Sequence, residues 1–85
     1  MKAAFNEYAA NSCAELRLNL ARYRKEAGLT QSQLADRTGI SKGYISKIEA
    51  KNSDTIPSLE TVLLIAYTLN IPPYLLFMRE ADWQE

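Results

Sequence analysis

Residues 29–49, LTQSQLADRTGISKGYISKIE, place ammonium, hydroxyl and amide groups at short intervals between apolar residues. Lys42 and Lys47 carry positive charge in this stretch, and Gln31 and Ser46 can donate or accept hydrogen bonds. These side chains suit binding of an anionic surface rather than the breaking of a covalent bond. These side chains therefore indicate recognition of an anionic partner. Their ability to bind it depends on the helices that position them.

The net charge of the whole chain is zero, but the charges are unevenly distributed along it. Residues 17–51 have a net charge of +5, whereas residues 52–85 have a net charge of −4 and residues 1–16 a net charge of −1. Because phosphate groups respond to the local field, the neutral average does not exclude a nucleic acid. The basic side chains of the middle segment are Arg17, Arg22, Arg24, Lys25, Arg37, Lys42, Lys47 and Lys51.

Residues suited to catalysis or metal binding are scarce. The chain has no histidine and one cysteine, Cys13, so a cysteine–histidine pair and an internal disulfide are impossible. We expect Cys13 to behave as a small buried apolar residue. No acidic pair converges and no glycine loop suits phosphate transfer, so we expect no catalytic residue, no metal site, no cofactor and no enzyme activity.

Length and composition favour one small globular domain over residues 1–85, because 47% of the residues are apolar and 24% are charged. The apolar runs of five or six residues are too short to cross a bilayer. No hydrophobic signal segment follows Lys2. We therefore expect a cytoplasmic protein without a membrane partner.

The first helix is predicted from its cap and its spacing. Ser12 followed by Glu15 forms a capping box, which marks a helix start, and Gly28 is predicted to end the helix. Residues 1–11 either lengthen this helix or form a separate arm. The apolar face of the helix is formed by Leu16, Leu20, Tyr23 and Ala27.

Two short helices with a tight turn between them are predicted over residues 30–49. Thr30 with Gln33 forms a second capping box, Gly39 supplies the positive φ of the turn, and Ser41 caps the next helix. Ala35 is small where the helices cross. The core side of the unit is predicted to contain Leu34, Ile40, Ile45 and Ile48.

A fourth helix is predicted to start at Pro57 and Ser58. The residues of this helix at the spacing expected for a core-facing side are Leu59, Val62, Leu63, Ala66 and Leu69. Leu64 and Ile65 extend the apolar surface almost all the way round the helix. Such a helix is either fully buried or shares its outer side with another chain. A fifth helix is predicted over residues 74–78, followed by a C-terminal tail over residues 79–85. No strand is expected, so the fold class is all-α with five helices.

The predicted burial of the isoleucines leaves one side of the third helix pointing outward, with Lys42, Gly43, Ser46 and Lys47 on it. A helix presented in this way fits the major groove of DNA, with its N-terminal residues at the base edges. The geometry inferred from the residues is therefore that of a helix-turn-helix.

The segment LTQSQLADRTGISKGYISKIE, with IPSLETVLLIAYTLNI after it, resembles the lambda-repressor-like helix-turn-helix family of phage repressors, Cro proteins and small bacterial regulators (the XRE type). The resemblance covers roughly residues 16–78. It implies an all-α, five-helix domain that binds double-stranded operator DNA, usually as a homodimer.

The resemblance implies a role for each matching position. Gln31 matches a phosphate-contacting glutamine, with plain capping as the alternative, and Ser41 matches a cap that often touches phosphate. Lys42 and Gly43 match base-contacting positions, although Lys42 could instead contact phosphate and Gly43 has no side chain for base recognition. The other expected contacts to DNA are Tyr44, Ser46 and Lys47, with Lys51 and Asn52 in the following loop. Tyr44 is expected to lie off the core face, on a phosphate or a thymine methyl group.

Glu49 would repel DNA if its carboxylate were free at the end of the third helix. In the family this position pairs with an arginine of the first helix, and Arg24 matches that arginine. We therefore expect a partly buried, structural Arg24–Glu49 ion pair.

Three functions are compatible with the sequence. The first is a sequence-specific DNA-binding regulator, a repressor or autoregulator that acts as a homodimer. The second is an antitoxin that also binds a protein toxin, and the third is an interaction module that does not use DNA. Candidates for the dimer surface are Leu64, Tyr67, Phe77 and Trp83.

Overall fold

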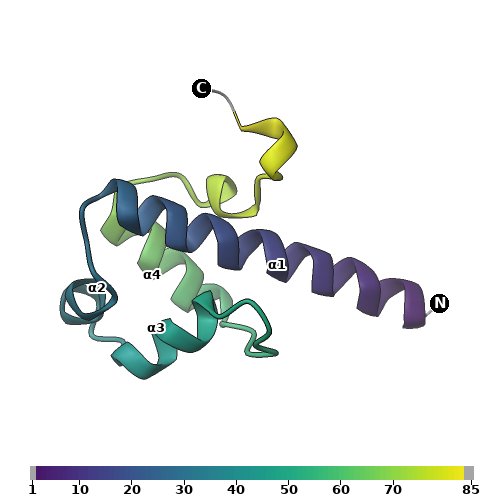
Figure 1. Cartoon of the computed structure of the whole chain (residues 1–85), viewed down its shortest axis with the longest axis horizontal. Coiled ribbons are helices and arrows are strands. Elements are labelled where there is room, and N and C mark those ends of the chain that lie inside the picture. The colour runs from purple at the N-terminus through teal and green to yellow at the C-terminus, as the bar shows by residue number, and fades with distance from the viewer. Residues whose placement is uncertain (1, 84–85) are drawn as a thin grey trace.

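The computed structural model describes residues 2–83, and every regular element in that range is helical (Figure 1). The α-helices are α1 (Lys2–Glu26), α2 (Gln31–Thr38), α3 (Lys42–Glu49) and α4 (Leu59–Leu69), and two 3₁₀ helices follow, η1 (Pro73–Phe77) and η2 (Glu80–Asp82). The all-α prediction is confirmed. The expected fifth helix is the 3₁₀ helix η1, so the described chain has four α-helices rather than five. None of these helices is long and apolar enough to cross a membrane.

The start of α1 differs from the prediction. The helix begins at Lys2 and runs through Ser12, so Ser12 lies inside the helix and does not cap it. Residues 2–11 therefore lengthen the first helix, and Met1 lies outside the described residues. Five alanines between residues 2 and 14, with no glycine or proline, favour continuation of the helix over a break at Ser12.

The caps of the short helices lie where the sequence places them. Thr30 and Gln33 exchange both bonds of the capping box, at 3.0 Å from the Gln33 amide to Thr30 Oγ1 and 2.8 Å from the Thr30 amide to Gln33 Oε1. Ser58 likewise caps α4 by accepting from the Thr61 amide at 3.1 Å. Gly39 ends α2 with a φ of 77°, a left-handed conformation that costs glycine least. Local chemistry therefore sets these helix ends.

One core joins all four α-helices and η1. Leu34, Ile45, Ile48, Ile65 and Leu76 are completely buried. Tight packing of these side chains fixes the orientation of α2 and α3 on α1 and α4. The rest of the core is formed by Leu16, Leu20, Leu29, Ala35, Val62, Ala66 and Leu69.

Asn19 lies in this core with no exposed surface. Its side-chain amide donates to the carbonyl oxygens of Leu76 and Met78, at 3.0 and 2.6 Å. Buried carbonyls need such donors, and η1 is too short to satisfy them internally. Asn19 therefore fixes the end of η1 on α1.

The buried side of α4 is rotated relative to the prediction. Val62, Ala66 and Leu69 are buried as expected, but Leu59 is 70% exposed and Leu63 is 44% exposed. Ile65 takes a core position instead, because its spacing to Val62 and Leu69 forms one face of the helix. The outer side of α4 thus keeps exposed apolar side chains.

Candidate nucleic-acid interface

The orientation of α3 is fixed by its cap and by two buried isoleucines. Ser41 Oγ accepts from the Tyr44 amide at 3.1 Å, which starts the helix, and Ile45 and Ile48 are fully buried beneath it. Because these contacts occupy one side, the opposite side faces solvent. The exposed residues on α3 are Lys42, Gly43, Ser46 and Lys47.

The loop after α3 extends this exposed surface, because Lys51 and Asn52 are both exposed. Among residues 2–83, neither Lys51 nor the two lysines of α3 forms a salt bridge. Their ammonium groups are therefore available to an external anion. Salt-bridged lysines would have to lose a partner first.

Tyr44 lies differently from the expectation. Its side chain is half-buried and packs against the core, so it does not lie off the core face. The reason is its position one helical turn before the buried Ile48, which places the two side chains on the same side of α3. A contact from Tyr44 to DNA is limited to the part of the ring that stays exposed.

Arg24 and Glu49 form a bidentate ion pair between α1 and the end of α3. Arg24 Nε lies 2.7 Å from Glu49 Oε2, and Arg24 Nη2 lies 2.9 Å from Glu49 Oε1. The two side chains are 9% and 6% exposed, so the pair is buried. The hydrogen bond to Glu49 raises the pKa of the Arg24 guanidinium, and the negative charge of Glu49 adds to this against the opposing effect of burial.

Gln31 joins the same cluster from the start of α2. Its side-chain amide donates to Glu49 Oε1 at 3.0 Å, while Arg24 Nη1 donates to the Leu29 carbonyl at 2.7 Å. One Gln31 N–H therefore serves Glu49, and the other is left for an external acceptor. The backbone N–H groups of the first α2 residues also have no partner within the helix, a feature that favours anions.

Arg17 is a structural residue that the sequence analysis missed. It is 7% exposed, and its guanidinium donates to the carbonyls of Ile48, Lys47 and Thr55 at 2.9, 3.4 and 2.7 Å. The carbonyls at the C-terminal end of a helix lack internal partners and carry partial negative charge. Arg17 therefore fixes the end of α3 and the following loop to α1. Its spacing of three residues to Leu20 and seven to Arg24 places it near the buried face of α1 and was the available signal.

We predict that Arg17→Met destabilises the protein by at least about 1.5–3 kcal/mol, the amount associated with one hydrogen bond to a charged group. The loss follows because three carbonyls lose their donor inside the protein. Urea unfolding measures the change. Arg37→Met, at an exposed position of α2, is the matched control, and equal small losses in both variants would contradict the assigned role.

We predict that Glu49→Gln lowers the free energy of unfolding by an amount on the order of 3–5 kcal/mol, because it leaves the charge of Arg24 buried without its counterion. Glu26→Gln is the matched control. Glu26 pairs with Arg22 at the surface and is 55% exposed, so its loss should cost less than about 1 kcal/mol. Thermal unfolding of both variants compares the two pairs. An unchanged midpoint for Glu49→Gln would overturn the prediction.

Comparison with known protein sequences identifies a helix-turn-helix family. The helix-turn-helix family HTH_3 matches residues 20–76. The HTH-type transcriptional regulator SinR of Bacillus licheniformis is 35% identical over 66 residues, which cover 78% of this chain and 58% of that protein. SinR of Bacillus subtilis (strain 168) is 36% identical over 52 residues, covering 61% of this chain and 46% of SinR.

The HTH-type transcriptional regulator SlrR of Bacillus subtilis (strain 168) is 40% identical over 63 residues, which cover 74% of this chain and 41% of SlrR. The chain thus spans about half the length of the curated relatives it matches. No solved structure gives a match. Since the family match extends over α2, α3, α4 and most of η1, the chain belongs to the lambda-repressor-like, XRE-type helix-turn-helix family.

Proposed function

We propose that this protein is a transcriptional regulator that binds double-stranded DNA by inserting α3 into the major groove. The observation that carries the proposal is the orientation of α3. Ile45 and Ile48 are fully buried on one side, and Lys42 and Lys47 are exposed without a salt bridge on the other. An isolated helix face of this kind fits the width of the major groove.

The proposed contacts divide into two classes. Lys42, at the N-terminal end of α3, is positioned for guanine O6 or N7, with Gly43 allowing close approach and Ser46 one turn further on. The remaining contacts would go to phosphates, which position the protein without reading sequence. They come from Gln31, Ser41, Tyr44, Lys47, Lys51 and Asn52.

The neutralised cluster of Arg24 and Glu49 supports the same proposal. A free carboxylate beside the phosphates would weaken binding, and the bidentate pair removes this charge from the surface. We infer that the pair is structural and has no direct contact with DNA.

We propose that the regulator acts as a homodimer, because a dimer of this family places two recognition helices in successive major grooves, one helical turn apart. We also propose that its binding represses transcription. The three relatives are named transcriptional regulators and none is named an antitoxin. We therefore prefer the regulator to the alternative with a toxin partner. Localisation in the cytoplasm follows from this proposal.

Salt dependence tests the DNA-binding proposal. With Lys47 and Lys51 on phosphates, the slope of log affinity against log salt should be about −1.8 per chain, at about −0.9 for each neutralised phosphate. Fluorescence anisotropy with a labelled duplex measures the slope. The duplex is first selected from a random pool, and a scrambled duplex is the control. A slope near zero on both would overturn the proposal.

Two lysine variants test the division between base and phosphate contacts. Lys42→Ala should cost about 1–3 kcal/mol at the selected duplex and relax the preference at one base pair. Lys51→Ala should weaken the selected and scrambled duplexes equally and reduce the salt slope by about 0.9. The measurement is anisotropy on a set of duplexes with single substitutions. Equal losses on all duplexes for both variants would contradict the assignment of Lys42.

A further inference from the structure

The first half of α1 is an exposed helix that extends beyond the rest of the molecule (Figure 1). It lies outside the family match, which begins at residue 20. Over residues 2–8 every residue is exposed, including Phe5 at 63% and Tyr8 at 71%. Between residues 2 and 14 the only charged side chains are Lys2 and Glu7. A helix that stays alone in water is usually polar all round, so this segment has the character of a packing surface.

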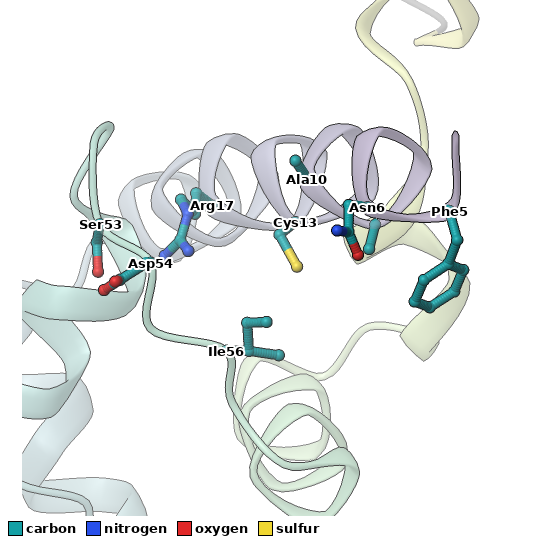
Figure 2. Close-up of a pocket in the computed structure, with 9 residues that line it drawn as sticks. Phe5, Asn6, Ala10, Cys13, Arg17, Ser53, Asp54 and Ile56 are labelled. Atoms are coloured by element: carbon teal, nitrogen blue, oxygen red, sulfur yellow. The ribbon is translucent and has the colours of Figure 1, made fainter. Parts of the chain in front are cut away.

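The exposed part of α1 and the loop before α4 enclose an apolar cleft of about 440 Å³. Figure 2 shows Phe5 and Cys13 of α1 pointing toward Ile56 of the loop. Ala9 also lines the cleft, and Ile56 is 68% exposed. The four-residue spacing of Phe5, Ala9 and Cys13 places them on one side of the helix, in line with the buried Leu16 and Leu20. The core face of α1 thus continues outward without a partner.

We propose that this cleft is occupied by the same segment of a second copy of the chain, with the two α1 helices antiparallel and the two-fold axis at Ala9. The proposal rests on the homodimer proposed above and assigns its interface. Two-fold symmetry requires a surface that is complementary to itself. About an axis at Ala9, Phe5 lies against the partner's Cys13, so the large ring faces the small side chain, and alanine at the axis permits close approach.

The charges at the two ends of the cleft are complementary under the same symmetry. Asp54 lies at the inner end beside Arg17, whereas Phe5 lies at the outer end (Figure 2). Arg17 is already bonded to backbone carbonyls, and Asp54 forms no ion pair with any residue from 2 to 83. Lys2, three residues before Phe5, would reach the inner end of the partner's cleft. An antiparallel pair therefore places an ammonium group beside each free carboxylate.

The size of the surface sets the expected strength of the dimer. A standard interface buries roughly 800 Å² of each partner, which is about one seventh of the 5878 Å² exposed by this chain. Thirteen helical residues span about 20 Å, and the exposed Ile56 of the loop widens the contact. We therefore expect an interface at the lower end of the specific range and a dimer that dissociates on dilution. The cleft lies at the C-terminal side of α3 and leaves Lys42 uncovered.

Sedimentation equilibrium of the full chain without DNA tests the interface. Phe5→Glu should raise the dimer dissociation constant roughly 30-fold or more, as expected when a charge replaces an aromatic side chain that the interface buries in both copies. Its circular dichroism should stay unchanged, because Phe5 is exposed within one chain. Tyr67→Glu is the matched control, since Tyr67 is 82% exposed on α4, and it should leave the constant unchanged. A monomeric wild type at its highest soluble concentration, or a dimer sensitive to Tyr67→Glu and not to Phe5→Glu, would overturn the proposal.

Cross-linking tests the position of the symmetry axis. Ala9→Cys combined with Cys13→Ser should form an intermolecular disulfide on mild oxidation, because the two Ala9 positions meet at the axis. Asn11→Cys with Cys13→Ser, which points away from the cleft by helical spacing, should not cross-link. Equal cross-linking of both variants would refute the antiparallel pairing. Neither experiment contains DNA, so failure of DNA binding and failure of this interface are separate results.

Discussion

The arrangement of the helix-turn-helix depends on burying a carboxylate, Glu49, at the end of α3. A buried charge is stable only when hydrogen-bonded donors surround it, and here Arg24 supplies two donors and Gln31 a third. These residues belong to α1 and α2, so satisfying one carboxylate fixes three helices relative to one another. This buried contact, together with Ile45 and Ile48, sets the orientation of the lysines on the outer side of α3.

Helix α1 also binds the C-terminal end of α3 through a second arginine, Arg17. Arg17 donates to the last carbonyls of α3 and to Thr55 in the loop, about two helical turns before Arg24. Both arginines are more than nine-tenths buried, and their guanidinium groups donate to α3, to the loop after it or to the turn before α2. Two of the eight basic side chains counted in residues 17–51 are therefore structural. The exposed lysines of α3 and the following loop keep their charge available to an external anion.

The apolar face of α1 is covered in its C-terminal half and exposed in its N-terminal half. From Leu16 onward its apolar face is covered by the core, whereas Phe5, Ala9 and Cys13 continue that face into an open cleft. The rotation of α4 adds Leu59 and Leu63 to the exposed apolar surface. Burying apolar surface is the dominant favourable term in association. A second copy that covers the α1 surface would link dimer formation to the same helix that positions α3.

The sequence by itself determined the features that arise within a few residues. The caps at Thr30, Ser41 and Ser58 and the turn at Gly39 follow from bonds that each residue makes to its own neighbours. The length of α1 was not fixed by such a signal, because the capping box at Ser12 competes with an alanine-rich run that favours continuous helix.

Only the tertiary structure decided which side of α4 faces inward, where Arg17 donates, and how far Tyr44 is buried. Each of these depends on contacts between residues distant in the chain, such as Arg17 with Thr55, and an apolar pattern that extends round a helix does not select one face. Local hydrogen bonds can be predicted from neighbouring residues. Burial requires the positions of all the other helices.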